Sequence, residues 1–565
     1  MMDFLEACAS SVRKAWDGDT PVKWRAMDLP PPRIGHLFGR KVLLIPGTAL
    51  EALSKQAFID LSFRIRPTFA KELATVAFDP AAEVKDRFTA KSLLDNAIES
   101  AAGVLPLCQD TGTATVYGWK GENVLVDSPR SDHQLLASGA ESAWKQGRLR
   151  NSQLSPLGGF KESNTGDNSP LAGELYSGKG SEYHLLFMAK GGGSSNKTVL
   201  FQETRHLLEP QAFEAFARQA VGQIGVSACP PYRLVFVIGG QSPEQCALAA
   251  KLASTGALDA LPIVPDAHNG MYRDTSLEAT IVRLATESGW GAQFGGRWMA
   301  RDARVIWLPR HAASLPVVLA VSCAAHRQMY VRIGPDGYFL EHLADREELA
   351  GIAAEVQTSF GRKTARLPVV AASTAGASTL NTGINFRRVN LDSLNPADLV
   401  AGEFVELWGT LVIARDAAHA RLATLIKEGK PLPEWTRMPV FYAGPTETPE
   451  GEIIGSIGPT TSKRMDVYQE ELLSRGAFTV SLGKGERTEA CRQACARHGG
   501  VYLVTIGGAA AIAARRHVSS MSLLDWPELG MEAVRQITLA GLPAMVAVDS
   551  RGRDYYAGFR DNQRV

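Results

Sequence analysis

The sequence has few of the cysteine patterns that usually identify a disulfide-bonded or zinc-binding protein. Seven cysteines stand among 565 residues, an odd and widely spaced set without a CxxC pair. A disulfide framework, a zinc ribbon and a thioredoxin-type redox pair are therefore not expected. Only Cys491 and Cys495 are close together, and their i,i+4 spacing is typical of two core residues on one helix face.

Long apolar runs and an excess of charge of one sign are also missing. No apolar run reaches the ~18–20 residues that a membrane helix needs, and the net charge is only +1. This balance does not favour a nucleic acid or an anionic membrane as a partner. The first twenty residues are interrupted by acidic side chains, which fits neither a secretory signal nor a transit peptide. We expect a cytoplasmic protein, with a mitochondrial location as the alternative if the N-terminus is trimmed.

The apolar pattern along the chain changes near its middle. In the first half, amphipathic helix-like spacing alternates with short apolar runs that are typical of strands. The expected helices cover residues 82–102, 209–224 and 242–255, and the expected strands cover 234–240, 303–309 and 316–323. Further along, strand-like runs recur with helical stretches between them, which favours an α/β arrangement there as well.

At 565 residues the chain is too long for one ordinary hydrophobic core, so we expect more than one domain. We predict an α/β fold with a helix-rich, mixed N-terminal α/β domain over residues 1–345 and a smaller C-terminal α/β domain over residues 376–565. Residues 346–375 carry small and polar side chains without a sustained period and are interpreted as a linker.

Glycines cluster in several loops that also carry basic side chains. These loops include KGGGSSNKT (190–198), GPTTSKR (458–464) and LGKGERT (482–488). None of them matches GxxxxGK[ST] or a GxGxxG that follows a strand, so a nucleotide site is only weakly supported. Thr460, Thr461 and Arg464 share one loop, and hydroxyl and guanidinium groups together suit a small carboxylate or phosphate.

Three cysteines lie in loop-like contexts beside turn residues. Cys108 is followed by Gln109 and Asp110 in VLPLCQDTGT, Cys229 precedes two prolines in SACPP, and Cys323 follows a strand-like run. Their separations match no local metal motif. The residues alone leave open both core positions and a shared metal site, for which soft thiolates weakly favour iron–sulfur over structural zinc.

Eight motifs in a fixed order give a more specific indication. They are LPLCQDTGT, GGGSSNKT, SACPP, RHAASLPVVLAVSCAAHRQ, ARDAAHARL, GPTTSKRMD, LGKGERT and WPELGMEAV. In this order they resemble the class I, iron–sulfur-dependent fumarate hydratases, in the fused single-chain form. The resemblance runs from about residue 60 to the end of the chain. It implies a homodimer, a C-terminal domain of the swivelling type, and an active site between the two domains.

The resemblance also implies a role for individual residues. Cys108, Cys229 and Cys323 are the expected ligands of a [4Fe-4S] cluster, which leaves one iron open to act as a Lewis acid. The expected substrate-binding residues are Gln109, Arg150, Gly193, Arg415, Thr461, Arg464 and Lys484. The expected proton-transfer residues are Asp110 and Thr460, with His311 as a relay or an orienting hydrogen-bond partner. Which of Asp110 and Thr460 acts as acid and which as base stays open.

The function implied by the resemblance is the reversible hydration of fumarate to (S)-malate. A related iron–sulfur hydro-lyase acting on tartrate or mesaconate is the alternative within the same class. An anion-binding or iron-sensing protein that keeps the cluster without turnover is a third possibility. The third possibility is disfavoured because an acid, an amide and several basic residues accompany the cysteines in the motifs.

Overall fold

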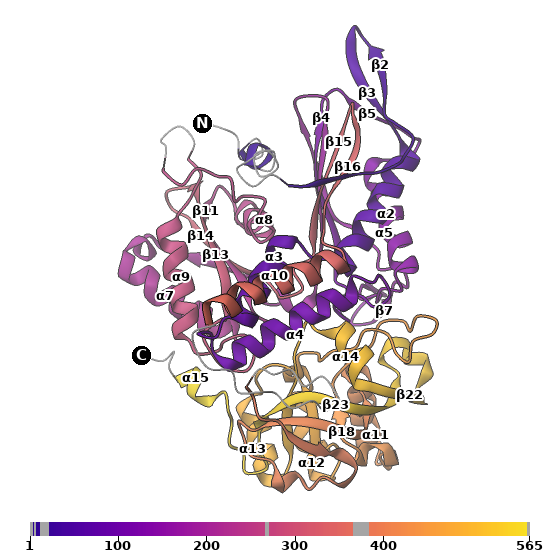
Figure 1. Cartoon of the computed structure of the whole chain (residues 1–565), viewed down its shortest axis with the longest axis vertical. Helices are drawn as coiled ribbons and strands as arrows, with labels where there is room; N and C mark the ends of the chain where they lie inside the picture. Colours follow the sequence, from indigo (N-terminus) through magenta and orange to yellow (C-terminus); the bar gives the residue numbers. More distant parts are fainter. Residues whose placement is uncertain (1–3, 5–6, 12–21, 266–269, 365–382, 562–565) are drawn as a thin grey trace.

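In the computed structural model, which describes residues 4, 7–11, 22–265, 270–364 and 383–561, the first half of the chain is built on two large β-sheets (Figure 1). The six-stranded sheet has the order β1 (Trp24–Ala26), β16 (Gly337–Glu341), β15 (Gln328–Gly334), β9 (Tyr183–Lys190), β4 (Thr113–Gly121) and β8 (Ala172–Gly178). The five-stranded sheet has the order β10 (Val199–Glu203), β14 (Leu315–Ser322), β11 (Tyr232–Gly240), β13 (Ala300–Arg310) and β12 (Tyr272–Arg273).

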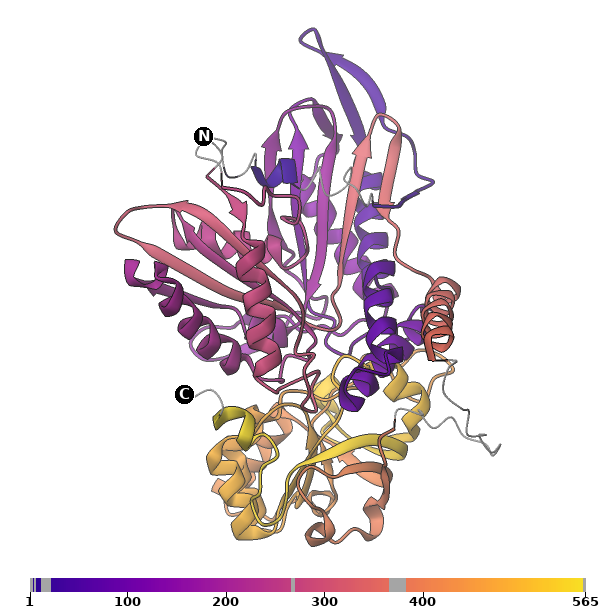
Figure 2. The ribbon, with the colours of Figure 1, turned by 60° about the vertical axis from the view of Figure 1, so that its left-hand side comes forward.

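Two smaller β-structures extend from these sheets. One is a three-stranded sheet of β2 (Arg33–Leu37), β3 (Arg40–Pro46) and β5 (Val124–Asp127), and the other is a hairpin of β6 (Leu154–Pro156) and β7 (Glu162–Asn164). The three-stranded sheet projects from the end of the molecule farthest from the C-terminal part (Figures 1 and 2).

Helices cover both large sheets and also separate them (Figure 2). The outer face of the six-stranded sheet packs on α2 (Gly47–Phe63) and α5 (Asp132–Gln146). Side chains of α8 (Pro243–Ala253) share a core with β4, β9, β11 and β14, so α8 lies between the sheets. The other face of the five-stranded sheet is covered by α7 (Pro210–Ile224) and α9 (Thr275–Glu287). Every residue of β11 is buried, as expected for a strand covered on both faces.

An aromatic cluster anchors the outer helical layer to the six-stranded sheet. Phe58 of α2 is fully buried and makes edge-to-face contacts with Trp144 of α5 and Phe187 of β9. We expect Phe58→Ala to lower the free energy of unfolding by ~3–5 kcal/mol, because it removes a large buried ring and leaves a cavity. Urea denaturation followed by tryptophan fluorescence measures this. Phe38→Ala is the control, since Phe38 is 96% exposed; an equal loss in both variants would contradict the prediction.

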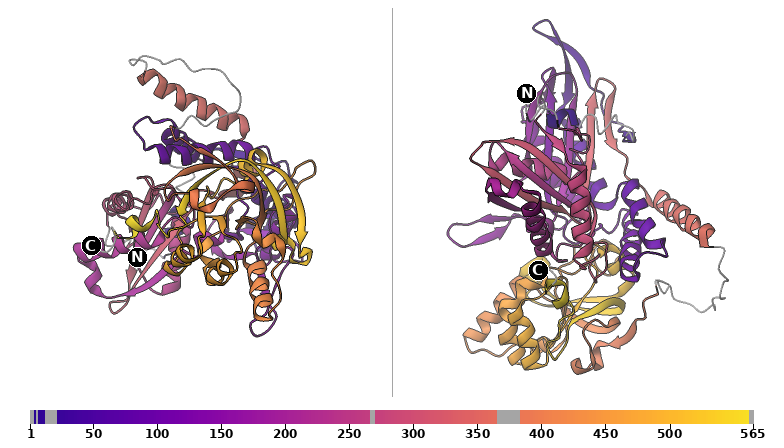
Figure 3. Two further views of the ribbon diagram at one scale, coloured as in Figure 1. Left: turned by 90° about the horizontal axis from the view of Figure 1, so that it is seen from below. Right: turned by 90° about the vertical axis from the view of Figure 1, so that its left-hand side faces the viewer.

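The expected linker begins as a helix. Residues 346–364 form α10 (Arg346–Thr364), which packs against α3 (Pro67–Phe78) and α4 (Val84–Ser100) on the outside of the molecule (Figure 3). Leu349 and Val356 belong to the same core as α3 and α4. Their spacing is helical, so this part of the chain carries a helix signal that its many small and polar residues obscure. Residues 365–375 of the expected linker lie outside the described residues.

The C-terminal part is a closed, barrel-like sheet. Its strands are β17 (Arg387–Asn390), β18 (Phe404–Ile413), β19 (Val440–Phe441), β20 (Val480–Gly483), β21 (Val501–Val504), β22 (Val518–Asp525) and β23 (Val534–Val548). β18 pairs with β19 on one side and with β23 on the other, and β23 also pairs with β21. The ring β18-β19-β20-β21-β23 is therefore complete, which leaves these strands without a free edge.

Helices surround this barrel. They are α11 (Asp416–Lys427), α12 (Asp466–Ser474), α13 (Glu489–His498) and α14 (Ala510–His517). The last helix, α15 (Ala557–Asp561), packs on the N-terminal part, where Phe559 contacts Trp290. Cys491 and Cys495 are both buried on α13, which confirms their interpretation as core residues of one helix. The predicted helices and strands of the first half correspond to α4, α7, α8, β11, β13 and β14. The α/β prediction for both parts is thus confirmed, and no helix in the described ranges is long and apolar enough to cross a bilayer.

Hydrogen bonds join the C-terminal part to the N-terminal part around the loop 505–511. The Asn96 side chain accepts from the backbone N–H groups of Ala511 and Ile512 at 2.9 and 3.1 Å. Gln293 accepts from the N–H of Gly507 at 2.7 Å and donates to its carbonyl oxygen at 2.9 Å. Both amide side chains are buried. These buried contacts fix the position of the loop, and thereby of the barrel, against the N-terminal sheets.

Candidate active site

A cavity of about 710 Å³ opens where the two parts of the chain meet. The residues that line it come from loops at the ends of strands and helices in both parts. Among them are Gln109, Asp110, Arg150, Gly193, Arg415, Thr460, Thr461, Arg464 and Lys484. Every predicted substrate-binding and proton-transfer residue except His311 therefore faces one space. Residues more than 300 positions apart in the sequence are brought together by the docking of the barrel.

The loop that carries Cys108, Gln109 and Asp110 connects α4 to β4 and is held against the C-terminal part. Gln109 is buried, and its amide donates to the carbonyl oxygen of Pro459 at 3.0 Å. Ser456 donates to the carbonyl oxygen of Pro106 at 2.6 Å. The unusual amide next to Cys108 thus has its partner in the other half of the chain, at the loop that carries Thr460.

Asp110 accepts several hydrogen bonds and lies beside cations. The backbone N–H groups of Gly192 and Gly112 donate to its two oxygens at 2.8 and 3.2 Å, and Arg150 lies at 3.4 Å. Burial raises the pKa of Asp110, but the attraction of Arg150, Arg327 and Lys484 outweighs it, so the pKa lies below its ordinary value. The carboxylate is therefore ionised at neutral pH and is ready to accept a proton.

The C-terminal part contributes basic and hydroxyl groups to the cavity. Arg415 directly precedes α11 and forms an ion pair with Glu532 at 2.7 Å. Arg464 donates to the hydroxyl oxygen of Thr460 and lies 3.2 Å from Asp416. Because the guanidinium of Arg464 donates to the hydroxyl oxygen of Thr460, the hydroxyl hydrogen of Thr460 points away from Arg464. The positive charge of Arg464 also favours the ionised form of this hydroxyl.

The three predicted ligand cysteines lie in one neighbourhood beside this cavity. The backbone carbonyl of Cys229 accepts from the N–H of Ala324, which directly follows Cys323, at 3.0 Å. Burial raises the pKa of Cys229 to about 11 and also raises that of Cys108, and the charges of the other two cysteines add to the effect on Cys229. Lys484 donates to Sγ of Cys229 at 2.8 Å, which opposes the shift.

These thiols meet the chemical requirements of an iron–sulfur ligand set. They are free of disulfides, they lie in three loops close enough for their charges to act on one another, and thiolates are the usual donors for such clusters. Among the described residues, no three His, Cys, Asp or Glu side chains converge as they would on a single ion. A cluster places its thiolates on separate irons, so three thiols on separate loops are the kind of donor set that a [4Fe-4S] group would use.

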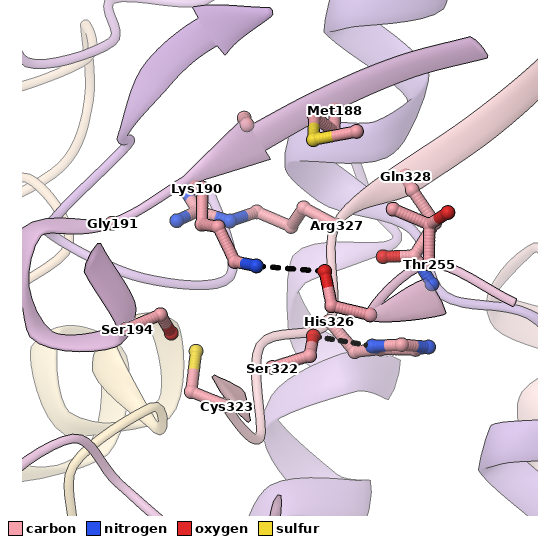
Figure 4. Close-up of a pocket in the computed structure, with 12 residues that line it drawn as sticks. Met188, Lys190, Gly191, Ser194, Thr255, Ser322, Cys323, His326, Arg327 and Gln328 are labelled. Carbon is pink, nitrogen blue, oxygen red and sulfur yellow. Dashed lines mark hydrogen bonds between the residues drawn. The ribbon is translucent and has the colours of Figure 1, made fainter. Parts of the chain in front are cut away.

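Several residues of this region were not among the predicted ones. Lys190, Ser194, His326 and Arg327 line a small cavity of about 20 Å³ next to Cys323 (Figure 4). Arg327 is buried, and its charge lowers the pKa of Asp110. Burial and Arg150 have larger effects on that pKa than Arg327 has. The AHRQ segment that contains His326 and Arg327 lies within one of the sequence motifs, and Lys190, at the end of β9, is the first residue of the glycine-rich loop KGGGSSNKT.

His311 lies apart from the cavity. It occupies the exposed turn between β13 and β14, where Nδ1 accepts from the backbone N–H of Ala313 at 3.2 Å. Within this chain the structure does not bring His311 to the other predicted residues, and its role stays a prediction.

Comparison with known proteins adds to this geometry. The family described as Fumarate hydratase (Fumerase) matches residues 51–332, and the family described as Fumarase C-terminus matches residues 362–559. Fumarate hydratase 2 of Leishmania major is 41% identical over 531 residues, covering 92% of this chain and 89% of the relative. The aerobic class I fumarate hydratase of Escherichia coli K12 is 39% identical over 532 residues, covering 93% and 92%. Mitochondrial fumarate hydratase 1 of Leishmania major is 39% identical over 526 residues, covering 91% of each chain. The chain therefore belongs to the class I fumarate hydratase family of hydro-lyases, in its single-chain form.

Proposed function

We propose that the protein catalyses the reversible hydration of fumarate to (S)-malate. The observation that carries the proposal is the cavity in which Asp110, Thr460 and four basic side chains meet next to Cys108, Cys229 and Cys323. The four basic residues are Arg150, Arg415, Arg464 and Lys484. A dicarboxylate carries charge at both ends, and these cations come from both parts of the chain, so each end has a partner.

We assign Cys108, Cys229 and Cys323 as the residues that hold a [4Fe-4S] cluster. Such a group with one open iron supplies a Lewis acid for the hydroxyl and carboxylate oxygens of the substrate. Lys484 lies between Cys229 and the substrate cavity and therefore links the two environments through its charge. Gln109, held by Pro459, is placed to donate its remaining amide hydrogen to a substrate oxygen, and Gly193 and Thr461 complete the contacts.

Asp110 and Thr460 handle the two protons of the reaction. Dehydration of malate removes a proton from C3 and delivers one to the departing hydroxyl at C2, and hydration reverses both transfers. Arg464 lowers the cost of ionising Thr460, which supports Thr460 as the base at C3. Asp110 then serves the oxygen at C2: as a carboxylate it accepts a proton from the adding water in hydration, and in dehydration it must first bind a proton, which it passes to the departing hydroxyl. His311, if it acts, would do so by orienting or relaying, as the sequence motifs imply.

The remaining assignments follow the same family pattern. We propose a homodimer, a cytoplasmic location with a mitochondrial one as the alternative, and a division into an N-terminal domain (1–345) and a C-terminal domain (376–565). The alternative activity is hydration or dehydration with tartrate or mesaconate as substrate. The cavity of about 710 Å³ has room for these substrates as well as for malate.

A substrate panel tests the proposal. The protein is purified without oxygen, its visible absorbance and iron content are recorded, and formation of the C=C bond is followed by ultraviolet absorbance with (S)-malate, tartrate and the hydrated form of mesaconate. We expect a coloured protein with the highest kcat/KM for (S)-malate. A coloured protein that ignores malate but dehydrates tartrate would refute the fumarate assignment.

Gly507 offers a second test, because it leaves room for Cys229. A Cβ atom at this position would lie 2.2 Å from Sγ of Cys229 and 3.1 Å from Cδ of Lys484. We expect Gly507→Ala to displace both side chains and to lower activity roughly 10- to 100-fold, since small displacements at a catalytic site have effects of this size. Gly351→Ala on α10 is the control, because its Cβ would meet no atom within 4 Å. Equal kcat and iron content in the two variants would contradict the prediction.

A further inference from the structure

A different basic side chain stands beside each of the three thiols. Lys484 contacts Sγ of Cys229 at 2.8 Å. The charge of Arg327 acts on Cys108, where it opposes the effect of burial and is the largest of the opposing influences. The third thiol, Cys323, lines a small cavity together with Lys190. Lys484 already belongs to the substrate cavity, whereas Lys190 has no part in the assigned chemistry.

Lys190 is placed by the end of a strand and by one hydrogen bond. It is the last residue of β9, and its Nζ donates to the hydroxyl oxygen of Ser254 at 2.7 Å. Figure 4 shows its ammonium group and the sulfur of Cys323 directed toward the same space, with Ser194 beside them. The cavity holds about 20 Å³, room for one water molecule and no larger ligand.

The surroundings of Lys190 lack a carboxylate that would balance its charge. Within the described ranges of the chain no carboxylate is among the groups that act on its pKa, and Lys251 adds a second positive charge nearby. Burial and Lys251 together lower the pKa of Lys190 to about 8, while Cys323 raises it. An ammonium group in such a place is stable only if an anion compensates it. Cys323 lines the same cavity, and as a ligand of the assigned cluster its sulfur would supply such an anion.

We propose that Lys190 is a positioning residue that supplies the positive charge next to the Cys323 thiolate and thereby sets the reduction potential of the cluster bound there. The inference rests on the cluster assignment made under the proposed function. A thiolate-bound cluster carries net negative charge, and reduction adds more. A cation nearby stabilises the reduced form and raises the potential, since net charge around a cluster is one of the factors that tune it.

The test compares Lys190→Met, Lys190→Arg and Lys120→Met in the full chain, reconstituted with iron and sulfide without oxygen. Lys120→Met is the matched control, because Lys120 lies at the opposite end of the β4–β9 pair and has its own partner, Asp132, at 2.8 Å. Iron content, circular dichroism, KM for malate and the midpoint potential of the one-electron couple are measured. We expect Lys190→Met to lower the midpoint potential of the cluster. At a fixed solution potential the ratio of oxidised to reduced cluster should rise about tenfold, which corresponds to ~59 mV.

Lys190→Arg is expected to restore most of the potential, since it keeps the charge, and Lys120→Met is expected to leave it unchanged. KM should change less than twofold in all three variants, because Lys190 does not line the substrate cavity. An unaltered potential in Lys190→Met, or an equal shift in Lys190→Met and Lys190→Arg, would overturn the inference. If Lys190→Met folds but binds no cluster while Lys190→Arg binds one, the need for a positive charge is supported. If neither variant binds a cluster, the inference is refuted. If the unaltered chain binds no iron, the cluster assignment itself is refuted. This outcome can be told from the others, because no variant would bind iron either.

Discussion

Replacing Cys229 with serine is expected to remove both the colour of the anaerobically purified protein and its turnover. Cys229 is 4% exposed and is held by Lys484 on one side and Gly507 on the other. A hydroxyl fills nearly the same volume, so the fold should survive, but it is a hard donor that replaces a soft thiolate. Changes to residues that only support a metal ligand cost about 10- to 100-fold, so loss of a ligand should exceed 100-fold.

Cys246→Ser is the matched control for this experiment. Cys246 is also fully buried, but it lies on α8 between the two sheets, where its thiol donates to backbone carbonyl oxygens. We expect Cys246→Ser to keep its iron and its activity, with at most a modest loss of stability. Iron content, visible absorbance and malate turnover measure the difference. A coloured and fully active Cys229→Ser protein would refute the ligand set.

Asp110→Asn is expected to lower kcat roughly 10²–10⁴-fold, the range typical for removal of a general acid or base. The substitution keeps the size of the side chain and one oxygen to accept from the N–H of Gly192, but it removes the ionisable group and the charge that faces Arg150. KM should change far less than kcat, because the basic residues that hold the two substrate carboxylates remain. Steady-state kinetics with (S)-malate separates the two effects.

Asp167→Asn provides the comparison for Asp110→Asn. Asp167 is a surface residue that accepts from the backbone N–H of Ser169 and does not line the cavity. We expect its replacement to leave kcat unchanged. An Asp110→Asn protein that keeps full kcat with a higher KM would show that Asp110 only binds substrate, which would remove it from the proton-transfer role.

The sequence was a good guide wherever the chemistry of neighbouring residues is local. Gln109 and Asp110 beside Cys108 were unusual because polar groups there need partners, and the structure supplies them in Pro459 and Gly192. Helix and strand patterns in the first half were also read correctly. The residues that meet across the cavity could be predicted only from the family motifs. Sequence spacing alone indicates which residues lie together within one helix or strand.

Two features required the three-dimensional structure. Closure of the C-terminal sheet depends on β18 pairing with β23, more than 100 residues later, and no local pattern reports such a pairing. Lys190 ends a strand whose other residues are buried and begins the loop KGGGSSNKT, and neither position reports that it lies beside Cys323. The helix α10 could have been predicted from the sequence, because its apolar residues have helical spacing. Its many small and polar residues favour a linker instead.

The docking of the barrel onto the N-terminal sheets has a consequence for how the protein behaves on dilution. Both parts line the substrate cavity, and the side-chain oxygens of the buried Asn96 and Gln293 accept from backbone N–H groups of the C-terminal part. Because one chain carries both, their association is intramolecular. Assembly of the cavity within one chain is therefore independent of protein concentration, whereas two separate chains would lose it as they are diluted below their dissociation constant.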